Sequence, residues 1–316
     1  MNSATTKTTL LFAHATGFCP QVWDPVIRRL QAAPLLQQVK QTLQFVTLTA
    51  PYHGSRRDNS IEAVVNLENP TSPRVKHPFN QWVDIVVDDM YDQVRQLRNN
   101  TVTTMRSPLI GIGHSLGAVA LWKTEVAHPG TFDGLILFEP PYTFTTPAHS
   151  KSMDFLVSVT LQRETKWPTQ DAAVAYFESY RNFASWDRES LQSFLEGAIV
   201  QDDEDNTWSL ACHPHIEASV YSGPWLSLRA EEFAKPKCRI VFQNGARSKL
   251  FEYDFFKSLE AKHPDVYKVE SPIANTSHLM VLEDPGAVST KILNALSEFP
   301  PFQKNSDPSE SKQSRL

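Results

Sequence analysis

Short apolar runs alternate with amphipathic stretches along the chain up to Phe138. The apolar runs predict buried strands at 8–13, 45–48, 109–112 and 134–138. Helices are predicted at 22–30, 81–97 and 118–127, and in 81–97 the apolar residues recur at three-to-four-residue spacing. Residues 58–78 hold several prolines and no clean period, which predicts an irregular surface segment. Strands that alternate with helices are typical of a parallel sheet with helices on its faces, so we expect an α/β fold.

The alternation stops after Phe138 and resumes near Cys238. The pattern between these points is helical, with helices expected near 155–161, 172–183 and 188–200. Beyond it we expect strand 238–242, helix 251–261, strand 266–269 and helix 285–296. The chain therefore predicts three parts: a core at 1–141 and 236–302, a helical lid at 142–235, and a disordered tail at 303–316. The aromatic richness of 142–235 favours a lid over a plain helical core.

Composition and charge narrow the class of protein. The 316 residues are 41% hydrophobic and 21% charged, which is typical of a globular protein with a sizeable core. A net charge of −5 gives no basic patch for nucleic acid, and no apolar run of 18 residues predicts a transmembrane helix. The polar amino-terminal stretch lacks the apolar centre of a signal peptide. Three widely spaced cysteines predict neither disulfides nor a zinc site.

Candidate chemistry begins at Gly113-His114-Ser115-Leu116-Gly117, between a predicted strand and a predicted helix. A nucleophile elbow has this order, because a sharp turn between strand and helix lifts a serine hydroxyl out of the sheet edge. Flanking glycines allow close approach of strand and helix and unusual backbone angles. An ordinary strand-to-helix turn can carry the same pattern. The flanking elements favour a nucleophilic Ser115.

A serine nucleophile needs a base, and the base needs a carboxylate that orients it. His278 is the one histidine in the loop between the last predicted strand and the last predicted helix, where the chain order serine, acid, histidine places the base. The loop 243–249 has no carboxylate, whereas Glu139 directly follows the strand 134–138. Ligands bind at the carboxyl ends of parallel strands, so we expect Glu139 to be the acid, with Glu252 as the next candidate.

An oxyanion intermediate needs two N–H donors. We expect the backbone N–H groups of Leu116 and Thr16 to supply them, Thr16 lying in the loop after the first strand. Candidate substrate-binding residues are Ala15, His114, Trp167, Tyr176 and Trp225. The acidic run 201–206 has no EF-hand spacing and is interpreted as a solvated turn, so no metal site and no cofactor are expected.

Four segments together resemble the α/β-hydrolase superfamily: the loop 14–18, the elbow 113–117, Phe138-Glu139-Pro140-Pro141 and Ser277-His278. Within it, the chain resembles fungal peroxisomal serine hydrolases of the toxin-biosynthesis, peroxisomal lipase and mycophenolic acyl-CoA hydrolase type. The separation of Ser115 and Glu139 is similar to that in this group. The zearalenone lactone hydrolase is a more distant likeness. The mycophenolic enzyme is longer and has Asp where this chain has Glu139, so its substrate is not carried over.

The resemblance implies cofactor-free cleavage of a carboxylic ester or thioester, such as an acyl-CoA or a lipid-like acyl substrate, through an acyl-enzyme. A lipase or lactonase with the same triad stays open, as does a non-catalytic binding protein of this fold. The final Ser314-Arg315-Leu316 differs by one conservative change from the S-K-L peroxisomal signal. It predicts binding to the peroxisomal import receptor and localisation to the peroxisomal matrix. A homodimer is left open.

Overall fold

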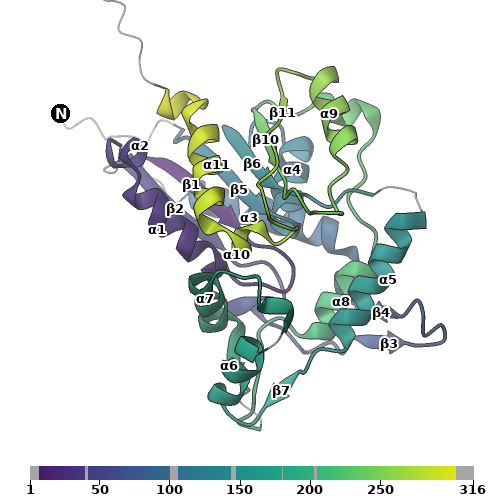
Figure 1. Ribbon diagram of the computed structural model, residues 1–316. Coiled ribbons are helices and arrows are strands. Elements are labelled where there is room, and N and C mark those ends of the chain that lie inside the picture. Colours follow the sequence, from purple (N-terminus) through teal and green to yellow (C-terminus); the bar gives the residue numbers. More distant parts are fainter. Residues whose placement is uncertain are drawn as a thin grey trace, which may run out of the picture.

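The computed structural model describes residues 7–39, 42–99, 106–143, 147–179, 181–202 and 205–303. A six-stranded sheet forms its centre, with the strand order β11-β10-β6-β5-β1-β2 and parallel pairing throughout (Figure 1). In chain order the strands are β1 (Thr8–Ala13), β2 (Leu43–Leu48), β5 (Leu109–His114), β6 (Gly134–Phe138), β10 (Ile240–Gln243) and β11 (Tyr267–Val269). The expected parallel sheet is confirmed. The tripeptide 314–316 lies outside the described residues.

Helices cover both faces of this sheet. The helices α1 (Asp24–Ala32) and α11 (Pro285–Ser297) share one hydrophobic core, and α3 (Trp82–Asn99), α4 (Leu116–Ala127) and α9 (Tyr253–Lys262) share the other. Successive strand residues alternate between the two cores: Leu10 and Phe12 belong to one, Leu11 and Ala13 to the other. Burial on both faces explains why the strands are continuous apolar runs in the sequence. The short helices α2 (Pro34–Gln37) and α10 (Met280–Glu283) complete this part.

The range 142–235 is called the insertion below, and the helices of its described residues lie below the central sheet in the view of Figure 1. Its helices are α5 (Pro147–Leu161), α6 (Gln170–Ser179), α7 (Arg188–Ala198) and α8 (Pro214–Ser222). The helical expectation is incomplete, because β7 (Lys166–Trp167), β9 (Trp208–Leu210) and β8 (Ile199–Gln201) form a small antiparallel sheet. Strands of two or three residues are too short to show an alternating pattern.

The segment 58–78 is also more ordered than its sequence predicts. It forms the hairpin of β3 (Val64–Asn66) and β4 (Arg74–Lys76), and the Val75 side chain is buried. The backbone N–H of Val75 donates to the Ser222 hydroxyl at the end of α8. Contact with the insertion therefore orders a segment whose own sequence lacks a strand pattern.

No described helix is both long enough and apolar enough to cross a membrane.

Candidate active site

Ser115 lies at the turn between β5 and α4. Its backbone has φ +52° and ψ −116°, an unusual conformation for a residue with a side chain. The Ser115 N–H donates to the Phe138 carbonyl at 2.9 Å, and the Gly117 N–H donates to the His14 carbonyl at 3.1 Å. A Cβ on Gly117 would lie 2.3 Å from the Ala13 carbonyl oxygen, so this turn can approach β1 only with glycine there.

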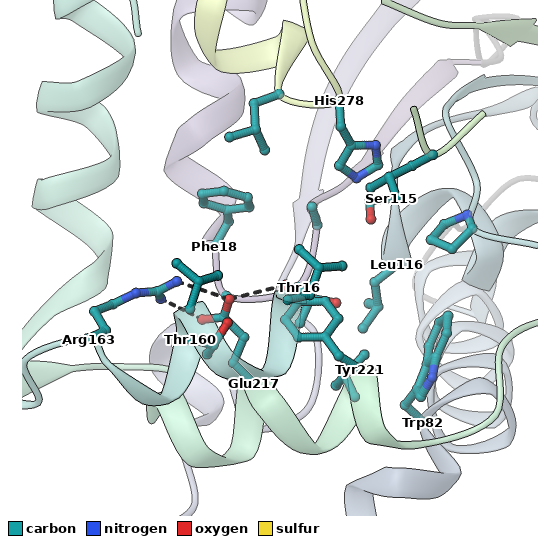
Figure 2. Close-up of a pocket in the computed structure, with 18 of the residues that line it drawn as sticks. Thr16, Phe18, Trp82, Ser115, Leu116, Thr160, Arg163, Glu217, Tyr221 and His278 are labelled. Carbon is teal, nitrogen blue, oxygen red and sulfur yellow. Dashed lines mark hydrogen bonds and ion pairs between the residues drawn. The ribbon is translucent and has the colours of Figure 1, made fainter. Parts of the chain in front are cut away.

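His278 and Glu139 form a direct pair. The Nδ1 atom of His278 lies 2.6 Å from Oε2 of Glu139, and because a carboxylate only accepts, Nδ1–H is the donor. This tautomer leaves Nε2 unprotonated and able to accept a proton. His278 and Ser115 line the same cavity, and Figure 2 shows both side chains at one end of it. The structure thus brings together the three side chains that the sequence predicts, with Glu252 exposed elsewhere at the start of α9.

Glu139 is held by more than His278. It follows β6 with φ +44° and its side chain is buried. Its Oε1 accepts the Gly245 N–H at 2.8 Å, and its Oε2 accepts the Ser248 hydroxyl at 2.6 Å. The loop after β10, which lacks a carboxylate, therefore supplies hydrogen bonds to a carboxylate that follows the neighbouring strand β6. No local pattern in the sequence identifies Ser248 as a partner of Glu139.

We expect Ser248→Ala to lower kcat about tenfold, because Oε2 would lose one of the two donors that fix its position. Ser248→Thr keeps the hydroxyl and should restore most of the rate. Steady-state kinetics of both variants, with thermal unfolding to confirm the fold, tests this. Equal rates for the alanine and threonine variants would show that the hydroxyl does not act through Glu139.

The loop that precedes η1 (Pro20–Trp23) contains Ala15 and Thr16, and both line the cavity. Two histidines hold this loop. The His14 Nε2 atom accepts the Ala50 N–H at 3.1 Å while its Nδ1 donates to the Ala15 carbonyl at 2.8 Å. The His53 Nε2 atom accepts the Gly17 N–H at 2.9 Å. Leu116 opens α4, so its N–H has no acceptor within the helix and is available to a ligand.

Both histidines act as acceptors only when neutral. Burial, followed by the nearby His53, lowers the pKa of His14 to about 3, and burial lowers the pKa of His53 as well. Burial, followed by the nearby His278, likewise lowers the pKa of His114 to about 3. The folded protein therefore keeps these rings uncharged below the ordinary histidine pKa, and those of His14 and His114 well below it, whereas the unfolded chain does not.

This difference makes stability pH-dependent. Between the unfolded pKa near 6.5 and the folded pKa of about 3, the unfolded chain binds more protons, so the free energy of unfolding falls as pH falls. Each such histidine contributes up to roughly 1.4 kcal/mol per pH unit. Urea unfolding at pH values from 7 to about 4 should show the decline, with a shallower slope in His14→Gln. Identical slopes in the two proteins would contradict this account.

Ser115 and His278 open into a cavity of about 270 Å³. Its aromatic lining residues are Phe18, Trp82, Phe183, Trp186, Phe194, Tyr221 and Trp225. Of the five substrate-binding candidates, Ala15 and Trp225 line it, whereas His114, Trp167 and Tyr176 do not.

These three residues lie elsewhere for identifiable reasons. His114 is buried beneath the site, where its Nε2–H donates to the His278 carbonyl at 2.8 Å. Trp167 and Tyr176 pack against each other and against Phe177 inside the insertion. Periodicity alone does not distinguish an aromatic residue that lines a cavity from one in the insertion's own core.

Four further polar residues of the lining, Thr160, Arg163, Glu217 and Tyr221, are not among the predicted site residues. Arg163 follows α5, and Glu217 and Tyr221 lie on α8. Arg163 and Glu217 are far apart in the sequence and meet only through the packing of α5 against α8, so no local pattern could have paired them. Among the described residues, no group of three or more His, Cys, Asp or Glu side chains could hold a metal ion.

Curated fungal proteins match part of the chain, and two of them illustrate the range. It is 29% identical over 125 residues to abhydrolase domain-containing protein AKT2 of Alternaria alternata, covering 38% of this chain and 46% of that protein. It is 32% identical over 72 residues to type I acyl-CoA thioesterase mpaH' of Penicillium brevicompactum, covering 22% of this chain and 17% of that protein. The chain thus matches less than half the length of these relatives.

Structural similarity extends over nearly the whole chain. Peroxisomal alpha-beta-hydrolase Lpx1 of Saccharomyces cerevisiae superimposes with a TM-score of 0.66 at 16% identity, covering 94% of this chain and 79% of that one. At this identity the likeness shows the fold alone. A family profile described as alpha/beta hydrolase family matches residues 10–290. The elbow at Ser115, the parallel sheet and this match together show that the chain belongs to the alpha/beta hydrolase family.

Proposed function

We propose that the protein is a serine hydrolase that cleaves a carboxylic ester or thioester through an acyl-enzyme. The observation that carries the proposal is the 2.6 Å pair of His278 and Glu139 beside a cavity that Ser115 also lines. A serine on a strained elbow, a histidine with a free Nε2 and a buried carboxylate together supply nucleophile, base and orienting acid.

In this mechanism His278 Nε2 takes the proton of the Ser115 hydroxyl as Oγ attacks the substrate carbonyl. The N–H groups of Leu116 and Thr16 stabilise the oxyanion. The protonated His278, stabilised by Glu139, returns the proton to the leaving alkoxide or thiolate. Water, activated by the same histidine, then releases the acid and restores Ser115.

The cavity supports an acyl substrate. Aromatic and aliphatic side chains form most of its lining, and such a surface favours an apolar chain over a strongly hydrated one. The name of the partial relative mpaH' describes an acyl-CoA thioesterase, so acyl-CoA is the substrate class to try first. A lipase or a lactonase would use the same side chains.

Labelling with a fluorophosphonate probe tests the nucleophile, with Ser115→Ala as the blank. We expect labelling of the wild-type protein at Ser115 and none in the variant. Thiol release from short, long and aromatic acyl-CoAs, measured beside nitrophenyl esters and a lactone panel, then tests the reaction. Thiol release absent in the variant supports a thioesterase, and ester or lactone cleavage alone supports the alternatives. An unlabelled wild-type protein without turnover would support a binding protein.

Peroxisomal localisation stays a prediction from Ser314-Arg315-Leu316. A fluorescent reporter that carries residues 303–316 at its carboxyl terminus should enter peroxisomes, and the same reporter without the final leucine should stay outside. Identical distributions of the two reporters would remove the basis for the prediction.

A further inference from the structure

A buried ion pair stands in the wall of the otherwise largely apolar cavity. Arg163 Nη1 lies 2.6 Å from Glu217 Oε2, and Nη2 lies 3.3 Å from Oε1. The Glu217 side chain is 5% exposed and the Arg163 side chain 20% exposed, and both line the cavity. Burying two charges costs free energy that their attraction only partly returns, so well-packed apolar residues would join α5 and α8 at least as firmly. The pair therefore calls for a role beyond holding the two helices together.

The hydrogen bonds of the pair leave donors available. Glu217 accepts from Arg163 and, through Oε1, from the Tyr221 hydroxyl at 3.1 Å. A guanidinium has five N–H donors, and Glu217 takes only two of those on Arg163. Because part of the Arg163 side chain is accessible and lines the cavity, a ligand can meet both a cationic donor and a carboxylate acceptor there.

The position of the pair relates it to the reacting centre. A Cβ on Gly17 would lie 2.5 Å from the Glu217 carboxylate, so Glu217 packs directly on the loop that holds Thr16. Figure 2 shows Arg163 and Glu217 at one end of the cavity and Ser115 with His278 at the other, with Thr16 between them. An acyl chain bound for attack at Ser115 and extended past Thr16 would thus reach the pair with an atom along its length.

The charges of Arg163 and Glu217 determine which substrate group can bind beside them. The pair is neutral as a whole, so a substrate carboxylate would add an uncompensated negative charge beside Glu217. A plain methylene would leave the free Arg163 donors without an acceptor. A hydroxyl fits both partners, because its oxygen can accept from Arg163 while its proton is donated to Glu217.

We propose that Arg163 and Glu217 form a specificity subsite that binds a hydroxyl group on the acyl chain of the substrate. The subsite rests on the proposed hydrolase function, because it assumes that the acyl carbonyl lies at Ser115. Tyr221 holds Glu217 in place and the aromatic walls bind the rest of the chain.

Matched nitrophenyl esters test the subsite. The two esters of a pair have the same chain length and differ by one hydroxyl, whose position is moved stepwise along the chain from pair to pair. A further series of esters ends in a carboxylate. For the best-placed hydroxyl we expect kcat/KM about 10- to 100-fold above that of the plain ester, since a hydrogen bond to a charged group has this strength. The preference should be absent in Arg163→Met/Glu217→Leu.

A control removes a more exposed ion pair that lies outside the cavity and also joins α5 to a neighbouring element. Arg74 Nη1 lies 2.7 Å from Asp154 Oδ1, which joins β4 to α5 as the proposed subsite joins the end of α5 to α8. Arg74→Met/Asp154→Leu should keep the hydroxyl preference. Equal rates for plain and hydroxylated esters in the wild-type protein would overturn the proposal, even if the Arg163/Glu217 variant did not fold. A preference for the carboxylate series, or one that survives in a folded Arg163/Glu217 variant, would also overturn it.

Failure of the subsite and failure of the hydrolase function give different results. Ester turnover and probe labelling without a hydroxyl preference would leave the hydrolase intact and remove the subsite. If no ester is turned over, calorimetric binding of the same esters to Ser115→Ala decides: tighter binding of one hydroxylated ester supports the subsite, and equal binding of all removes it.

Discussion

Glu139→Gln is expected to lower kcat about 10⁴-fold while leaving the fold intact. The amide is nearly isosteric with the carboxylate, and its oxygen can still accept the Gly245 N–H. Its NH₂ group would face His278 Nδ1, which lies 2.6 Å from the carboxylate oxygen it replaces. An NH₂ group there favours the tautomer with the proton on Nε2, and that tautomer cannot accept the proton of Ser115.

Steady-state kinetics would measure the loss of kcat, and near-ultraviolet circular dichroism would show whether the fold is intact. Glu252→Gln is the matched control, because Glu252 is exposed and was the next candidate acid in the sequence. It should keep wild-type turnover. Near-normal activity in Glu139→Gln, together with loss in the control, would move the acid to Glu252.

Gly117→Ala is expected to destabilise the protein by about 3 kcal/mol, although alanine is normally favoured over glycine in a helix. The new Cβ would lie 2.3 Å from the Ala13 carbonyl oxygen and 2.7 Å from the His14 carbonyl oxygen. Both oxygens belong to the backbone, one to β1 and one to the loop after it, so α4 and the elbow must move away from them. Displacing Ser115 and the Leu116 N–H by about 1 Å should also cost about 100-fold in kcat.

A second helical glycine provides the comparison. A Cβ on Gly286 in α11 would have Asp284 Oδ1 at 3.4 Å as its nearest neighbour, an ordinary contact. Gly286→Ala should therefore be neutral or stabilise by up to about 1 kcal/mol. Urea unfolding of the two variants gives the comparison, and similar unfolding free energies would mean that the elbow tolerates a side chain.

The sequence predicts the sheet well because its strands are buried on both faces. Runs such as 109–112 and 134–138 are continuous and apolar, and helices occupy the sequence between successive strands. The approach of Ser115 to Glu139 follows from topology, since β5 and β6 are parallel neighbours whose carboxyl ends meet at one sheet edge. Their roles in catalysis stay a prediction until the kinetics are measured.

What the sequence could not predict depends on packing between distant segments. The strands of the insertion are too short to show a pattern, and the Arg163–Glu217 pair exists only because α5 meets α8. His14 and His53 both precede Ser115 in the chain, and nothing local in the sequence indicates that their rings accept backbone N–H groups. Trp167 and Tyr176 show the opposite error, because aromatic residues in the insertion also build its own interior.

Glu139 lies directly after β6, and this position joins it to the start of the insertion. The insertion begins just beyond Pro140 and Pro141, where Tyr142 forms a bridge with Leu226 near the insertion's return to the sheet. The Glu139 carboxylate that pairs with His278 thus lies next to the start of the insertion, and the loop after β10 donates two hydrogen bonds to it. A substitution that shifts the backbone at Pro140 or Pro141 would therefore move the hydrogen-bond partner of His278 together with the start of the insertion.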